Sequence, residues 1–301
     1  MPVEGIKKVL VLGAGTMGLQ ISLVSAYRGY EVALYDISEQ ALQAAPSRQR
    51  MWAERAKQMG RADLGDVGKL IAGITCTTDP QKAAQNADLV SESVAEKVEV
   101  KREVHALFEK LCPPACVLTT NTSSLLASAI DPALKHPEKF AAMHFHSGLS
   151  LLVDIMRGNK TNDHTVEVLK KYIRSIGMVP MVMKKEKGGY LYNTLLGSHL
   201  KAALSLVIGG YADPQDVDRA WMLVTGQAFG PFAAMDGIGL NIVRDAGENL
   251  FGAEVAFTPE QLASFIEPFL ERGELGMKTG KGFYTYPEPA FQKPDFLQGK
   301  E

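Results

Sequence analysis

Residues 9–19 constrain the fold more than any other part of the chain, because they read VLVLGAGTMGL, an apolar run that leads through glycines into a helical pattern. Three of these glycines fit the G-x-G-x-x-G spacing. In that motif the first glycine allows a tight turn, the second lets a pyrophosphate approach the backbone, and the third lets helix and strand pack closely. The start of the helix also offers free N–H groups to phosphates. The predicted phosphate-binding residues are Gly13, Gly15, Thr16, Met17 and Gly18.

An acidic residue at the end of the next predicted strand extends this prediction. Residues 31–36 form an apolar run that ends in Asp36, 18 residues after Gly18. A carboxylate at this place can accept hydrogen bonds from the diol of an adenosine ribose, whereas it would repel a 2′-phosphate. No arginine follows Asp36 directly, because Ile37 and Ser38 occupy the next two positions. The sequence therefore predicts binding of NAD rather than NADP.

The composition narrows the class of protein. With 301 residues, 46% of them hydrophobic and 22% charged, the chain is typical of a soluble globular protein of two domains. A formal net charge of −2 and the lack of a long apolar run predict neither a nucleic-acid partner nor a membrane. Cys76, Cys112 and Cys116 are odd in number and lack C-x-x-C spacing, so neither a disulfide framework nor a metal site is expected. With no apolar leader ahead of the first strand, we expect a cytoplasmic location.

The hydrophobic pattern changes character once along the chain. Short apolar runs alternate with helical segments in the first part, and the later periodicity is helical. We therefore predict an α/β fold: a doubly wound, Rossmann-type, mostly parallel sheet of about eight strands over residues 1–186, followed by a smaller all-α domain over 187–301. The second domain is expected to open with an apolar helix 190–208, which places Asn193 one turn inside it.

Polar side chains gather at the predicted carboxyl edge of the sheet, which in an open parallel sheet faces the ligand. Hydroxyl and amide side chains at residues 120–124 follow one strand, and the strand 140–146 delivers His144 to the same edge. Asp154 lies among apolar neighbours in the next predicted strand. Because a buried acid must be paired or hydrogen-bonded, a histidine within reach is its expected partner.

Other charged residues have a plainer interpretation. Glu96 and Lys101 flank the start of a helix, and their spacing alone favours a surface ion pair. The predicted helix 39–59 is rich in basic residues, among them Arg50 and Lys57, and its spacing favours a solvated face. These residues gain a function only if a ligand lies over them.

In these motifs and in their order, the chain resembles the L-3-hydroxyacyl-CoA dehydrogenase family, in particular its short-chain 3-hydroxybutyryl-CoA members. The resemblance covers almost the whole length. The motifs that carry it are residues 13–18 (GAGTMG), 92–96 (ESVAE) with Lys101, 121–125 (NTSSL), 144–146 (HFH), 189–196 with Asn193, 230–232 (GPF) with Asp236, and 278–284 (KTGKGFY).

The resemblance implies an NAD-dependent oxidoreductase that interconverts (S)-3-hydroxyacyl-CoA and 3-ketoacyl-CoA by hydride transfer, in fatty-acid or butyrate metabolism. It makes His144 the general base, a task that suits imidazole, with a carboxylate to orient it. Ser123 and Asn193 match positions that hydrogen-bond the reacting oxygen or the thioester carbonyl. The residues that match contacts on the cofactor side are Glu96, Lys101 and Asn121, and those on the side over which coenzyme A lies are Arg50 and Lys57.

One segment departs from the family pattern. The family reads His-Phe-x-Asn-Pro from its catalytic histidine and carries a glutamate twelve positions beyond that histidine. Here residues 146–149 read HSGL and position 156 is Met, so a two-residue deletion would bring Asp154 onto the glutamate position. The match keeps an orienting carboxylate that is one methylene shorter. It leaves open what the altered loop, residues 146–150, does to rate and substrate.

Two alternatives therefore stay open. The altered loop would also suit a relative that oxidises a free hydroxy compound, such as an L-carnitine or L-gulonate dehydrogenase. It would suit as well an NAD(H)-binding protein with little catalysis, like the lens lambda-crystallins of this superfamily. In each case the apolar helices exceed what one small helical domain can cover. We therefore expect a homodimer joined through the C-terminal domains, with the active site in the cleft between the two domains of each chain.

Overall fold

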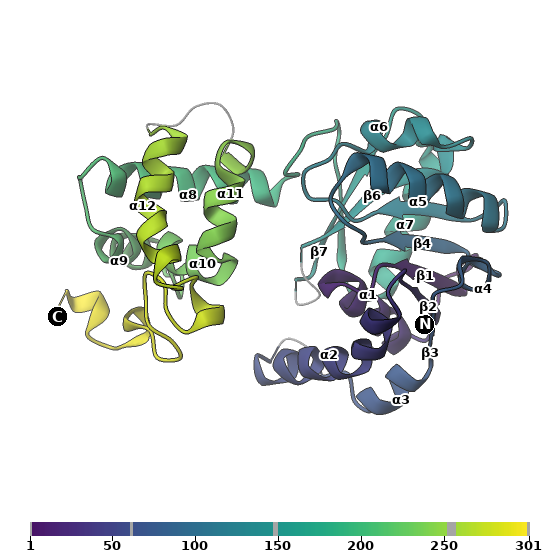
Figure 1. Cartoon of the computed structure of the whole chain (residues 1–301), viewed down its shortest axis with the longest axis horizontal. Coiled ribbons are helices and arrows are strands. Elements are labelled where there is room, and N and C mark those ends of the chain that lie inside the picture. The colour runs from purple at the N-terminus through teal and green to yellow at the C-terminus, as the bar shows by residue number, and fades with distance from the viewer. Residues whose placement is uncertain (1, 61–62, 147–149, 252–256, 300–301) are drawn as a thin grey trace. The chain divides into compact units, whose positions relative to one another are not determined.

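The computed structural model describes residues 2–60, 63–146, 150–251 and 257–299. The chain divides into two compact units, Met1–Tyr190 and Leu191–Glu301, where the sequence prediction put the boundary after residue 186. Figure 1 shows the strands in the first unit and the long helices α8 to α12 in the second. Each unit has its own buried apolar core.

The first unit is built on one eight-stranded sheet with the order β3-β2-β1-β4-β5-β6-β7-β8. All neighbouring strands are parallel except β6 and β7, which are antiparallel. The predicted doubly wound, mostly parallel sheet is confirmed. The strands are β1 (Lys8–Leu12), β2 (Glu31–Tyr35), β3 (Ile74–Thr77), β4 (Leu89–Glu92), β5 (Val117–Thr120), β6 (Phe140–Phe145), β7 (Leu152–Arg157) and β8 (Val179–Val182).

Helices cover both faces of this sheet (Figure 1). Side chains of α1, α2, α3 and α7 share one buried cluster with strand residues, and those of α4, α5 and α6 share the other. Since Ala142 and Met143 of β6 enter opposite clusters, both faces of the strand are buried, which explains its continuous apolar run. These helices are α1 (Thr16–Tyr27), α2 (Glu39–Gln58), α3 (Val67–Ala72), α4 (Pro80–Ala84), α5 (Val98–Leu111), α6 (Ala127–Ile130) and α7 (Asp163–Ser175), with 3-10 turns at Asp131–Ala133 and Pro137–Lys139.

The second unit is helical, as predicted. It contains α8 (Tyr192–Ile208), α9 (Pro214–Thr225), α10 (Pro231–Ile238), α11 (Leu240–Phe251) and α12 (Pro259–Glu271), with 3-10 turns at Met277–Thr279, Ala290–Gln292 and Phe296–Gln298. Because α8 begins at Tyr192 rather than at residue 190, Asn193 lies at the second position of the helix, and the expectation that it lies one turn inside is wrong. The sequence interpretation had also not identified α3 and α11.

Two buried aspartates hold the end of the chain against the helices of the second unit. The Asp218 carboxylate accepts hydrogen bonds from the backbone N–H of Phe232, at 2.8 Å, and from the Tyr284 hydroxyl, at 2.9 Å. Asp236 accepts a hydrogen bond from the backbone N–H of Phe283, at 2.9 Å. Burial raises the pKa of both carboxyl groups. The 230–236 and 278–284 motifs therefore serve the core of this unit.

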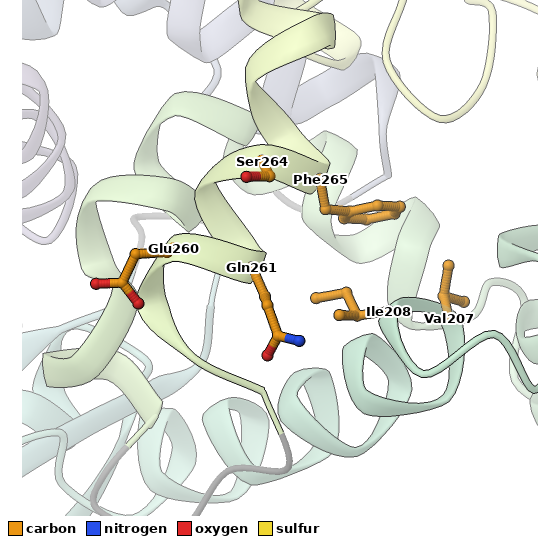
Figure 2. Close-up of a pocket in the computed structure, with 6 residues that line it drawn as sticks. All are labelled: Val207, Ile208, Glu260, Gln261, Ser264 and Phe265. Carbon is orange, nitrogen blue, oxygen red and sulfur yellow. The ribbon is translucent and has the colours of Figure 1, made fainter.

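A hollow of about 420 Å³ lies between α8 and α12 (Figure 2). Its lining combines three apolar and three polar side chains, Val207, Ile208, Phe265, Glu260, Gln261 and Ser264. None of these is among the residues that the sequence predicted to be functional. In the described ranges, no helix combines the length and the apolar character needed to cross a membrane.

Candidate active site

The glycine turn between β1 and α1 has one open position and two crowded ones. A Cβ atom added to Gly13, whose φ is +101°, would lie 2.6 Å from the Ser93 carbonyl oxygen, and one added to Gly18 would lie 1.8 Å from the Gly13 carbonyl oxygen. A Cβ atom on Gly15 would meet nothing within 4 Å. The first and third glycines are therefore required by the packing of the chain itself, whereas the second leaves space for a pyrophosphate.

Asp36, which follows β2, is hydrogen-bonded to this turn. One oxygen of the Asp36 carboxylate accepts a hydrogen bond from the backbone N–H of Ala14, at 2.7 Å. The Arg48 guanidinium, whose role the sequence did not reveal, donates to the Ala14 carbonyl oxygen at 3.1 Å. Among the described residues no side chain caps the start of α1, so first-turn N–H groups such as those of Thr16 and Met17 are available to an anion. The turn fits the pyrophosphate and ribose of NAD.

Lys101 lies in the interior rather than on the surface. Its side chain is fully buried and donates a hydrogen bond to Glu92 at 2.8 Å, with a Glu96 oxygen 3.3 Å away. The surface ion pair favoured by the spacing is therefore wrong in its location. Although burial alone would raise the pKa of Glu92, its contacts with His105 and Lys101 outweigh burial and lower that pKa to about 2. The network joins the end of β4 to the first two turns of α5.

Glu96 fixes the loop that follows β5. Its carboxylate accepts hydrogen bonds from the Thr122 hydroxyl and from the backbone N–H groups of Ser123, at 3.0 Å, and Ser124, at 3.2 Å. Ser123 itself is exposed. Lys101 therefore acts on this loop through Glu96, and the loop presents Ser123 at its surface.

Asn121 ties three strand ends together. Its side-chain amide donates to the Ser93 hydroxyl at 3.3 Å and accepts a hydrogen bond from the backbone N–H of Phe145 at 2.9 Å. Ser93 follows β4, Asn121 follows β5, and Phe145 ends β6. The amide thereby fixes the backbone next to His144.

His144 and Asp154 lie directly opposite each other in the antiparallel pairing of β6 and β7. His144 Nδ1 is 3.9 Å from Asp154 Oδ2, too far for a hydrogen bond, whereas the same oxygen lies 2.7 Å from His146 Nε2. The hydrogen bond of Asp154 therefore goes to His146, which the sequence interpretation did not consider. Burial lowers the pKa of His144, and His146 adds to this effect, while Asp154 opposes it.

A further neighbour of His144 comes from the end of the first unit. The fully buried Tyr190 ring stacks on the imidazole, with ring centroids 4.6 Å apart and planes inclined by 20°. This contact restrains the His144 ring, and no sequence motif indicated it. The part of the altered loop at residues 147–149 lies outside the described residues.

The remaining predicted residues are distant from His144 in the sequence; they are Asn193, Arg50 and Lys57. Asn193 is half-buried in the first turn of α8. Arg50 and Lys57 are exposed on α2, and the Lys57 ammonium is 3.1 Å from Asp63. The contacts of Arg50 and Lys57 are those of a solvated helix face.

The parallel strands bring the ends of β1, β4, β5 and β6 to one edge of the sheet, where a doubly wound sheet binds its ligand. The glycine turn and Asp36 at this edge are typical of one class of proteins, the oxidoreductases that bind NAD on such a sheet. Within that class, family models match both units. Residues 8–187 match the NAD-binding domain of 3-hydroxyacyl-CoA dehydrogenase, and residues 189–286 match its C-terminal domain. The chain belongs to the 3-hydroxyacyl-CoA dehydrogenase family.

Individual relatives agree with this assignment. The chain is 31% identical to a Caenorhabditis elegans protein named probable 3-hydroxyacyl-CoA dehydrogenase, over 93% of each chain. It is 30% identical to a 3-hydroxybutyryl-CoA dehydrogenase of Mycobacterium tuberculosis, over 94% of this chain and 99% of the relative. A diketoreductase structure, solved in work on dual catalysis of dicarbonyl compounds, matches with a TM-score of 0.87 and 34% identity, over 94% of this chain and 100% of that one.

Proposed function

We propose that the chain interconverts a short-chain (S)-3-hydroxyacyl-CoA, 3-hydroxybutyryl-CoA in particular, with its 3-keto form, and that His144 is the general base. The position of His144 carries the proposal: its restrained ring lies near the carboxyl end of β6, and the glycine turn follows the carboxyl end of β1 in the same sheet. A bound NAD, held by the glycine turn and Asp36, would supply the acceptor for the hydride of C3. The reaction needs a binding site for the cofactor and a base, and the residues that we propose for both lie at one edge of the sheet.

The chain's own residues divide the remaining tasks. The backbone at Gly15 and the N–H groups that start α1 bind the pyrophosphate, and Asp36 binds the adenosine ribose. One nitrogen of His144 takes the proton of the substrate hydroxyl. Asp154 acts as a positioning residue through His146, which is hydrogen-bonded to Asp154 and whose ring centroid lies 4.3 Å from that of His144. Ser123 and Asn193 hydrogen-bond the reacting oxygen or the thioester carbonyl.

We propose the remaining contacts with the cofactor and with coenzyme A as the resemblance implies them, with one refinement. Glu96 and Asn121 serve the cofactor side, and Lys101 acts there through Glu96, since its ammonium is fully buried against two carboxylates. Arg50 and Lys57 contact the phosphates of coenzyme A from their exposed positions on α2. Exchanging both for Gln should raise the KM for the thioester and leave NADH affinity unchanged.

The substrate assignment is tested by NADH oxidation with a panel of acceptors. We expect turnover with acetoacetyl-CoA. L-Carnitine and L-gulonate are tested in the reverse assay, which follows the reduction of NAD. Turnover with either of them, and none with the thioester, would favour a dehydrogenase of a free hydroxy compound. NADH binding with no turnover on any substrate would point to a crystallin-like protein.

A second candidate is the reduction of a dicarbonyl compound that carries no coenzyme A. The observation that favours it is the 34% identity to a diketoreductase over nearly the full chain. A dicarbonyl compound without coenzyme A therefore belongs in the panel. A kcat/KM for that compound above the value for acetoacetyl-CoA would make this candidate the better one.

We also propose a homodimer formed through the C-terminal unit. Large apolar side chains are exposed there, among them Tyr211 at 81%, Leu223 at 57% and Val224 at 87%. Sedimentation velocity should give twice the chain mass, and a monomer at assay concentrations would contradict the proposal.

Cys76, Cys112 and Cys116 are free thiols, which supports a reducing compartment such as the cytoplasm.

A further inference from the structure

Three side chains with metal-binding atoms converge beside the proposed base. His144 lies in β6 and His146 follows the end of that strand, and the centroids of the two rings are 4.3 Å apart. The β6–β7 register adds Asp154 from directly opposite His144. One ligand atom from each of the three lies within 4.8 Å of the others. Sequence spacing alone could not show this cluster, because Asp154 enters it through strand pairing.

The donor set is that of a zinc site. Two imidazole nitrogens and one carboxylate oxygen, with a remaining position for water, match zinc sites with three protein ligands. Magnesium and calcium prefer sets made of oxygen atoms. Ligand atoms of a tetrahedral zinc site lie roughly 3.4 Å apart. His144 Nδ1 is 3.9 Å and His146 Nε2 is 2.7 Å from Asp154 Oδ2, and these two distances lie on either side of that spacing.

Two atoms of the cluster provide an independent observation. His144 Nδ1 and Asp154 Oδ1 are buried, and among the described residues neither has a hydrogen-bond partner. His144 is 5% exposed and Asp154 is fully buried, so water does not compensate them freely. Buried polar atoms without a partner cost free energy, and coordination to a cation would satisfy His144 Nδ1.

We propose that His144, His146 and Asp154 bind one zinc ion, and that zinc reversibly inhibits the dehydrogenase. The inhibition, but not the binding, rests on the proposed function. A neutral imidazole that coordinates zinc through Nδ1 carries its proton on Nε2. His144 then has no free electron pair to accept the proton of the substrate hydroxyl. Removal of zinc by a chelator restores that electron pair.

Binding is measured on the full-length protein after removal of metals with a chelator. Titration with zinc against a chromophoric competitor should give one site per chain. His146→Gln removes one ligand and should weaken binding at least about tenfold, the lower range for losses of groups that support a metal site. The matched control is His136→Gln, because His136 is an exposed histidine 3.3 Å from Glu138, outside the cluster. It should bind zinc like the wild type.

A second readout uses cobalt in place of zinc on the wild-type protein, so that it does not depend on the folding of a variant. Cobalt should give the intense visible absorption of a four- or five-coordinate site with histidine ligands. A weak spectrum like that of the hydrated ion, or zinc affinities of wild type and His146→Gln that agree within error, would overturn the proposal.

The activity assay then separates the two proposals. If the wild type oxidises NADH with acetoacetyl-CoA, zinc should abolish turnover, a chelator should restore it, and inhibition of His146→Gln should need at least about ten times more zinc. Zinc binding without any thioester turnover would retain the metal site and reject the proposed function. Thioester turnover that saturating zinc does not change would reject the inhibition.

Discussion

Gly15 and Gly18 lie three positions apart, yet only one of them has space beside it. A methyl group on Gly18 would overlap the Gly13 carbonyl oxygen, whereas one on Gly15 would meet no atom of the protein. The G-x-G-x-x-G spacing predicted both glycines and the reason for each. What the spacing could not show is the hydrogen bond from the Ala14 N–H to Asp36, which joins the turn to the acid of the next strand.

Substitution by alanine should separate the two roles. We expect Gly18→Ala to lower the free energy of unfolding by at least about 2 kcal/mol, because backbone must move to admit the methyl group. Gly15→Ala should leave that free energy within about 0.5 kcal/mol of the wild type. It should weaken NADH binding by about tenfold or more, since the methyl group takes the place of the pyrophosphate. Urea unfolding and NADH fluorescence titration measure these effects, and normal NADH binding by Gly15→Ala would contradict them.

The helix α5 shows which signals of the sequence were sufficient and which were overlooked. Lys101, His105 and Phe108 follow each other at helical spacing, so Lys101 lies on the buried face together with an apolar side chain. That pattern could have revealed the buried ion pair, but the interpretation used only the separation of Glu96 and Lys101. The bond between His146 and Asp154 is different, because it depends on side-chain rotation across a strand pair and leaves no periodic signal.

The buried network of Glu92, Lys101 and His105 should make the free energy of unfolding depend on pH. Because the pKa of Glu92 is lowered from 4.5 to about 2, its ionised form stabilises the fold above pH 4.5, and this stabilisation is lost as the pH falls towards 2. Glu92→Gln should therefore lower the free energy of unfolding by about 3 kcal/mol at pH 7, and the difference should shrink below pH 4.5.

Urea unfolding at pH 7, 5 and 3.5 measures this difference. The exposed Glu99 in the first turn of α5 provides the control, and Glu99→Gln should change the free energy by less than about 0.5 kcal/mol. A difference between wild type and Glu92→Gln that is independent of pH would show that the ionised carboxylate does not stabilise the network.

In the whole molecule, the change from strand patterns to helical patterns predicted a sheet unit followed by a helical unit. The sheet and both of its apolar clusters lie before residue 191, and a separate cluster holds the second unit together. Short alternating runs and cap residues were sufficient for this level of organisation. The start of α8 was placed two residues early, because Tyr190 is apolar yet adopts a φ of +51°, which no propensity predicts.

The separate cores predict that residues 1–190 fold and bind NADH without the second unit. We expect an NADH affinity close to that of the whole chain, because the glycine turn and Asp36 belong to the first unit. Turnover should be absent, because Asn193 is missing. Circular dichroism and NADH titration of this fragment test the prediction, and a folded fragment that does not bind NADH would refute it.

The central claim is that an imidazole at position 144 removes the substrate proton. Its most direct test is kcat for NADH oxidation with acetoacetyl-CoA in the wild type and in His144→Ala, with His136→Ala as the control. We expect His144→Ala to lose at least about hundredfold in kcat, the lower range for a general acid or base, while its NADH affinity and the kcat of His136→Ala stay unchanged. A kcat of His144→Ala within a few-fold of the wild-type value would contradict the account.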